Sequence, residues 1–157
     1  MTEPRRRPPP AARSAARLGA VQALFQMDLS GADVGEVLAQ FSSRAIGDDF
    51  DGGECGEADY GFLKQVVSGT VTGQRQIDLA VNAALDQSWP INRIDATVRA
   101  ILRAAAFEIM LMPHVPARVS INEYVDVANA FFDGEEPRFV NGVLDKLARN
   151  QRPQEFV

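Results

Sequence analysis

The sequence predicts an all-α protein. Apolar residues recur with the period of an α-helix in segment after segment, and no stretch alternates apolar and polar residues with the β-branched enrichment of a strand. Glycine or proline stands between these segments, where helices end. With 157 residues, 46% of them hydrophobic and 24% charged, the chain has the size and composition of one globular domain.

The first expected helix runs from about residue 11 to residue 29, and Gly31 is placed to end it. Residues 1–10 precede it as a disordered basic arm, because three prolines and three arginines in a row supply no apolar face. A short amphipathic helix follows, with apolar residues between 34 and 41. Four glycines and several carboxylates then mark 47–56 as a loop, for which we find no functional account.

Two further helices are expected in the middle of the chain. Residues 59–72 carry apolar pairs at four-residue intervals, a pattern typical of a buried helix. A fourth helix, containing Ile77 and Val81, stops before Trp89 because the residue preceding a proline is pushed out of the α region.

The last three helices make up the rest of the domain, which we place at residues 11–150. The segment 95–112 is apolar around most of its circumference and is expected to be the central helix. In the next helix, Ser120 and Glu123 have the spacing of a capping box at its start. Pro137 fits the first turn of a seventh helix, and residues 151–157 are expected to form a loose tail.

Charge is divided unevenly along the chain. The formal net charge is -5, which alone argues against a nucleic-acid-binding protein. Residues 1–20, however, hold five arginines and one glutamate, a net charge of +4, so the remainder carries -9. The basic end can attract a polyanion, and the acidic body cannot.

No catalytic, cofactor or metal site emerges from the sequence. His114 is the only histidine and lies in a loop between prolines, and Cys55, the only cysteine, lies among carboxylates that raise a thiol pKa. A single cysteine also excludes an internal disulfide and favours a reducing compartment, here the cytoplasm. The acidic loop lacks the spacing of a calcium site, no phosphate-binding glycine loop is present, and the longest apolar stretch is too short to span a membrane.

One motif near the C-terminus carries a resemblance. The segment Phe139-Val140-Asn141-Gly142-Val143-Leu144-Asp145 resembles the F-V-N-G-V-L-D segment of the NusB family of transcription antitermination factors. The likeness extends to residues 13–25, to residues 101–108 and to residues 119–128, in the order that the family has them.

The resemblance implies a bundle of about seven helices in two packed subdomains and a binding function rather than an enzymatic one. It implies binding of single-stranded boxA-type RNA in ribosomal RNA operon transcripts, together with the small-subunit ribosomal protein that acts as NusE. The pair would join the RNA polymerase antitermination complex and support rRNA maturation. The sequence leaves open whether the chain is a monomer or a homodimer.

The resemblance also assigns candidate residues. Arg5, Arg6, Arg7, Arg13 and Arg17 are expected to contact phosphates, and Phe139 and Asn141 to stack on a base and read its edge. Core packing is an equally good interpretation of Phe139. Arg103 and Glu108 are weaker candidates for the partner-protein surface, and Arg103 equally suits a salt bridge with Glu108 or another carboxylate.

Two other functions remain open on the sequence. One is a self-associating or protein-binding scaffold; the other is a module related to the N-terminal domains of rRNA cytosine methyltransferases. For the RNA-binding interpretation we expect replacement of both Arg13 and Arg17 by alanine to weaken RNA binding without changing thermal stability.

Overall fold

The computed structural model describes residues 10–44, 57–86 and 89–157. Arg5, Arg6 and Arg7 of the predicted arm, and the whole of the predicted acidic loop at 47–56, lie outside this part of the chain. Within it there are seven α-helices, two short 3₁₀ helices and no strand, which confirms the predicted fold class. The elements are α1 (Pro10–Ser30), α2 (Val34–Arg44), α3 (Glu57–Thr72), α4 (Gln74–Ala84), η2 (Ile91–Arg93), α5 (Ala96–Leu111), α6 (Ala117–Phe131), α7 (Glu136–Gln151) and η3 (Pro153–Phe156).

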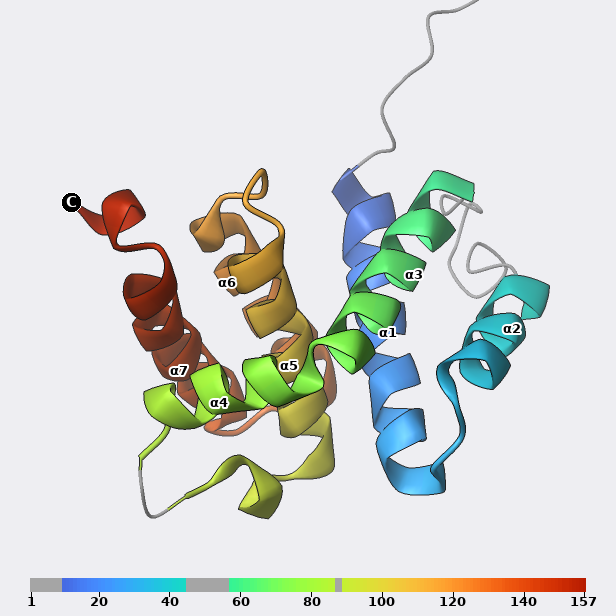
Figure 1. Ribbon diagram of the computed structural model, residues 1–157, viewed down its shortest axis with the longest axis horizontal. Coiled ribbons are helices and arrows are strands. Elements are labelled where there is room, and N and C mark those ends of the chain that lie inside the picture. Colours follow the sequence, from blue (N-terminus) through green and yellow to red (C-terminus); the bar gives the residue numbers. More distant parts are fainter. Residues whose placement is uncertain (1–9, 45–56, 87–88) are drawn as a thin grey trace, which may run out of the picture.

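The helices form two packed groups. In Figure 1, α1, α2 and α3 lie together on one side of the molecule, and α4, α6 and α7 lie on the other around α5. Helix α5 packs against helices of both groups, including α1, α3, α6 and α7. A single continuous apolar core therefore joins the two halves.

Helix α1 presents a narrow alanine face to its neighbours. Ala12, Ala16, Ala20 and Ala23 are all fully buried, so the backbone of α1 lies close to α3 and α5. The helix ends as predicted at Gly31, whose φ of 74° is the left-handed conformation that glycine adopts without strain. Its N–H donates to the carbonyl of Met27 at 2.9 Å, which closes the last turn.

Helix α5 is the central helix, as its sequence predicts. Ten of its 16 residues are buried, including the charged residue Glu108. Asp95 caps its start, because the carboxylate accepts hydrogen bonds from the N–H groups of Thr97 and Val98.

The predicted start of α6 is wrong. The helix begins at Ala117, one turn before Ser120, so Ser120 and Glu123 are not a capping box. The N–H of Ala117 instead donates to the carboxylate of Glu155 from the C-terminus, at 2.9 Å. Both predicted cap residues point into the bundle, where Ser120 is buried and Glu123 pairs with Arg17. A tertiary interaction thus takes the place of the local one.

The expected loose C-terminal tail is also wrong. Helix α7 continues to Gln151, and Arg152 behind it is only 5% exposed. Its guanidinium group donates hydrogen bonds to main-chain carbonyls at the end of α5 and in the turn that follows. A charged residue beyond Ala148, the last buried apolar residue of α7, is therefore part of the interior.

Helix α3 crosses α5 at a glycine. A Cβ atom built on Gly69 would lie 2.2 Å from a ring carbon of Phe107, far inside van der Waals contact. Phe107 is itself buried, at 6% exposure, so its ring has little space into which to move. The absence of a side chain at position 69 lets the two helices approach.

We expect Gly69→Ala to destabilise the fold by about 1–3 kcal/mol, since the added methyl group overpacks the core. The matched control on the same helix is Gly61→Ala, where a Cβ meets nothing within 4 Å. That control should gain up to about 1 kcal/mol from the higher helix propensity of alanine. Urea unfolding of both variants measures the difference, and equal stability of the two would contradict the proposed contact.

Candidate nucleic-acid interface

Arg13 lies on the exposed surface of α1, near its start. Its guanidinium carbon is 4.4 Å from the centroid of the Phe62 ring in α3, a distance typical of a cation–π contact. Arg13 takes part in none of the ion pairs among the described residues. Phe62 therefore positions a positive charge that is free to meet a phosphate group.

Arg17, one turn further along α1, lies on the same face but is buried. Its side chain is 4% exposed, and its guanidinium donates to both carboxylate oxygens of Glu108, each at 2.9 Å. A third hydrogen bond, also 2.9 Å long, goes to Glu123. With this burial the side chain offers no surface to a phosphate group, so the geometry does not fit the sequence interpretation of Arg17 as a phosphate ligand.

Glu108 is at the centre of this polar cluster and has no exposed surface. Besides Arg17, its carboxylate accepts hydrogen bonds from the hydroxyl groups of Ser120 and Tyr124. All these groups come from α1, α5 and α6, so the cluster ties three helices together. Other side chains cover Glu108 completely, so it cannot touch a partner protein directly. The interpretation of Glu108 as a partner-contacting residue therefore does not fit this fold.

Two groups of this cluster, Arg17 and Tyr124, have shifted pKa values. Burial on its own lowers the pKa of Arg17, but the hydrogen bond and the charge of Glu108 outweigh burial and leave the pKa raised. Burial also raises the pKa of Tyr124 well above its usual range, and the neighbouring Glu108 charge adds to this. Arg17 thus remains a cation and Tyr124 a neutral donor at any pH near neutrality.

Phe139 occupies the first turns of α7 and is 40% exposed, so it is not a core residue. It lines an open, largely apolar groove with a volume of about 380 Å³. The other lining residues come from the segment before α5, from the start of α5 and from the start of α7: Trp89, Ile94, Asp95, Val98, Glu135 and Glu136. Trp89 is 58% exposed and was not singled out by the sequence as a functional residue. An aromatic groove of this kind suits a stacked base.

Asn141 is exposed but does not share a face with Phe139. Two residues apart on a helix, their side chains point about 200° away from each other. The structure therefore does not bring this predicted pair into one site.

The two candidate regions lie apart. Phe139 and its groove belong to the start of α7 and the segment before α5, whereas Arg13 belongs to the start of α1. In Figure 1 the first turns of α1 and of α7 lie at opposite ends of the molecule. A single ligand that contacts both regions must cross the surface between them.

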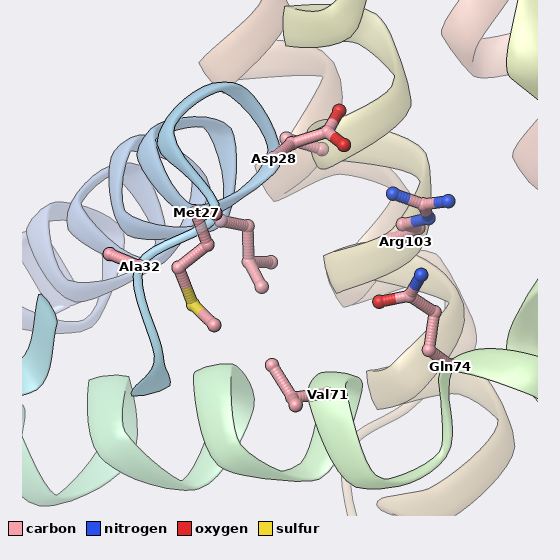
Figure 2. Close-up of a pocket in the computed structure, with 9 residues that line it drawn as sticks. Met27, Asp28, Ala32, Val71, Gln74 and Arg103 are labelled. Carbon is pink, nitrogen blue, oxygen red and sulfur yellow. The ribbon is translucent and has the colours of Figure 1, made fainter. Parts of the chain in front are cut away.

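Arg103 pairs with Asp78 rather than with Glu108. Its Nε and one terminal nitrogen donate to the two carboxylate oxygens of Asp78, at 2.8 and 2.9 Å. Arg103 also lines a pocket of about 240 Å³ between α1, α3, α4 and α5, and Figure 2 shows Met27 and Val71 facing this hollow beside it. Gln74 and Asp28 add polar groups to its rim.

The described residues contain no group of three histidine, cysteine or carboxylate side chains that are close enough to hold a metal ion. None of the helices in that part of the chain has the length and apolar character needed to cross a bilayer.

The profile of the NusB family matches residues 14–149. Curated relatives with the name transcription antitermination protein NusB are similar over most of the chain. The protein of Rhodopseudomonas palustris (strain BisB18) is 49% identical over 144 residues, which cover 92% of this chain and 85% of the relative. That of Maricaulis maris (strain MCS10) is 47% identical over 144 residues, covering 92% and 90%.

Solved structures show the same fold at lower identity. A crystal structure of T. maritima NusB matches with a TM-score of 0.74 and 23% identity, covering 99% of both chains. A structure of the antitermination factors NusB and NusE in complex with double-stranded RNA matches with a TM-score of 0.75 and 23% identity, covering 90% of this chain and 98% of the other. At this identity the likeness establishes the fold alone.

Proposed function

Because the chain belongs to the NusB family of transcription antitermination proteins, we propose that it binds single-stranded RNA of the boxA type in rRNA operon transcripts. It does so in the cytoplasm with a small-subunit ribosomal protein, the NusE component, and delivers the pair to transcribing RNA polymerase. The result is suppression of premature termination and support of rRNA maturation. In this function the chain is a binding protein and not an enzyme.

The proposal rests on Arg13, which is exposed and is not neutralised by a carboxylate among the described residues. In a chain with a net charge of -5, it is an exposed guanidinium that no carboxylate neutralises among the described residues. The arginines at positions 5 to 7 precede it on the same end of the sequence and add to the local positive charge. Arginine suits this role because its planar group makes two parallel hydrogen bonds to a phosphate.

Phe139 supplies a second kind of contact in this proposal. A base stacks on its exposed ring within the groove that Trp89 also lines. Base stacking tolerates many sequences, so recognition of a particular RNA element needs polar groups in addition. The exposed amide of Asn141 is such a group, and it would meet a different nucleotide because it lies on another face of α7.

The ribosomal partner is assigned to the acidic body of the protein. Ribosomal proteins are basic, and residues 21–157 carry the negative charge of the chain. Arg103 and the pocket beside it form part of this surface in our proposal, because apolar walls with a polar rim suit a protein side chain (Figure 2). Glu108, being buried, contributes only by holding the helices that frame the surface.

The test is an RNA titration with and without the ribosomal protein. With roughly three to five phosphates neutralised, log K should fall against log salt with a slope of about -2 to -3.5. Addition of the ribosomal protein should raise the RNA affinity. Affinity that does not depend on salt, or a chain that binds the ribosomal protein but never RNA, would favour the scaffold function instead.

We expect Arg13→Ala to weaken RNA binding and to make the salt slope shallower by about 0.7, the contribution of one phosphate on a single strand. Thermal stability should change by less than about 0.5 kcal/mol, because the side chain is exposed. Arg93→Ala, which removes another exposed arginine at η2, serves as the charge-matched control. An identical slope for Arg13→Ala and the unmodified chain would exclude Arg13 as a phosphate ligand.

A further inference from the structure

The outer face of α7 leads away from the groove that contains Phe139. Helix α7 begins at the groove that contains Phe139 and ends near η3, beside the start of α6. The start of α1 is tied to α6, because the Ser14 hydroxyl donates to Glu123 at 2.6 Å. Helix α6 packs against both α7 and α1, so a strand that follows α7 to its end reaches α6, which still separates it from Arg13.

The solvent-exposed face of α7 contains a glycine that the fold does not need. Gly142 is exposed in the interior of the helix, and a Cβ at this position would meet nothing within 4 Å. Glycine is the least favourable residue after proline inside a helix. In contrast to Gly69, no contact within the described structure explains it. A glycine on an open helix face lets another molecule approach the helix backbone closely.

Positive charges follow Gly142 along the same face. Arg138, Gly142 and Arg149 recur at helical spacing, and Lys146 lies beside them, all exposed. Lys146 takes part in none of the ion pairs among the described residues. The carboxylates on this face are Glu135 and Asp145, and each is paired with an arginine, at 3.9 and 2.9 Å.

At the end of the helix an aromatic ring contacts Arg149 and one further arginine, Arg118. The ring of Phe156 in η3 has the guanidinium carbon of Arg149 at 4.7 Å and that of Arg118 at 5.4 Å from its centroid. Arg118 is exposed, lies in the first turn of α6 and has no ion pair within the described part of the chain. From Phe139 to Arg149 the rise of the helix is about 15 Å, so several backbone phosphates fit along it.

We infer that the outer face of α7 is the path of a single-stranded RNA backbone. This inference rests on the proposed function and extends it. The strand leaves the groove at Phe139, passes close over the helix backbone at Gly142, and places phosphates at Lys146, Arg149 and Arg118.

The test replaces Gly142 with a long neutral residue. Gly142→Gln should reduce the affinity for a single-stranded boxA-type RNA at least about tenfold, because the side chain occupies the approach to the helix. The matched control is Gly35→Gln on α2, an exposed helical glycine whose Cβ meets only the Asp33 side chain, at 3.4 Å. Figure 1 places α2 on the side of the molecule away from α7.

Both glutamine variants should melt at or above the temperature of the unmodified chain, since glutamine favours a helix more than glycine does. Loss of RNA affinity in a variant that is at least as stable cannot come from unfolding. Unchanged RNA affinity of Gly142→Gln overturns the inference, and so does a loss of ribosomal-protein binding with RNA binding intact, which would assign the face to the protein partner. If the unmodified chain fails to bind RNA, the proposed function itself falls.

Discussion

Replacement of Arg17 by alanine is expected to lower the free energy of unfolding by about 3–5 kcal/mol, the usual cost of removing one partner of a buried ion pair. For a chain of this length that is a fall in melting temperature of roughly 6–20 °C. Thermal unfolding followed by circular dichroism measures it.

The loss of stability in Arg17→Ala arises from Glu108, which remains buried without its cation. Glu108 has no exposed surface, and Arg17 supplies two of the four hydrogen bonds that its carboxylate accepts from side chains. Without the guanidinium, the carboxylate keeps only the hydroxyl groups of Ser120 and Tyr124, which carry no compensating charge. A buried anion without a cation is strongly unfavourable because the interior cannot solvate it as water does.

The matched control is Arg13→Ala, one turn away on the same helix. Because Arg13 is exposed, that variant should melt within about 1–2 °C of the unmodified chain. The double variant Arg17→Met with Glu108→Gln removes both charges and keeps an acceptor for Ser120 and Tyr124, so it should recover part of the lost stability. An Arg17→Ala protein as stable as Arg13→Ala would contradict the buried pair.

This result separates two arginines that look alike in the sequence. The spacing of Arg13 and Arg17 predicts a shared face, which the structure confirms, because both guanidinium carbons lie near the ring of Phe62. The sequence interpretation of both arginines as exposed RNA ligands also predicts unchanged thermal stability when both are replaced by alanine. The burial of Arg17 does not fit that prediction. Which of the two points inward depends on where Glu108 and Glu123 lie after α5 and α6 have packed, more than 90 residues further along the chain.

The helices themselves were predictable from local pattern. Apolar periodicity located all seven, and Gly31 and Asp95 lie at an end and a start as turn and capping preferences require. The capping box at Ser120 and Glu123 failed for a physical reason. Both side chains have partners in other helices that are worth more than a local cap, and the start of α6 is capped from Glu155 instead.

The sequence singled out some residues of the candidate RNA-binding groove, but it did not predict how they are arranged. The motif around Phe139 left a base-stacking residue and a core residue equally open, and the folded chain exposes the ring. The groove beside it depends on Trp89 and Ile94, which precede α5 and meet α7 only in the folded chain. Asn141 was grouped with Phe139 because the two are adjacent in the sequence, but helical geometry separates them.

The second large effect is expected at Arg152, which no sequence pattern marked. Its Nε and terminal nitrogens donate to the carbonyls of Glu108, Ile109 and Met112 in the last turn of α5 and at its end, at 2.7–3.1 Å. Another bond, 2.6 Å long, goes to the carbonyl of Val115 in the turn before α6. Carbonyls at the end of a helix lack partners within it, and the helix dipole is negative there, so a cation is the suitable cap.

Glu155 completes the arrangement at the start of α6. Its carboxylate accepts a hydrogen bond from the N–H of Ala117 and pairs with Arg152 at 2.8 Å. The hydrogen bond from Ala117 and then the charge of Arg152 lower the pKa of Glu155 below its ordinary value. A carboxyl group with a lowered pKa stabilises the fold above its ordinary pKa, and this contribution is lost as the pH falls through the lowered value.

We therefore expect Arg152→Ala to cost about 3 kcal/mol, because it leaves the carbonyls of Ile109 and Val115 without their donor and takes one of two donors from those of Glu108 and Met112. The end of α5, the turn and the start of α6 should lose protection from hydrogen exchange before the rest of the bundle does. Part of the acid-dependent stability should also disappear, since Glu155 loses its cation. Urea unfolding at neutral and at acid pH, together with hydrogen exchange, measures both effects.

Arg138→Ala on the same helix is the control, because its side chain is 87% exposed and its ion pair with Glu135 is 3.9 Å long, so it should change stability by less than about 0.5 kcal/mol. Arg152→Lys separates charge from geometry. A lysine keeps the cation near the end of α5, but a single ammonium group cannot reach four carbonyls at once, so it should fall between the alanine variant and the unmodified chain. If Arg152→Ala is no less stable than Arg138→Ala, the C-terminal residues do not hold the α5–α6 turn, and the tail is loose after all.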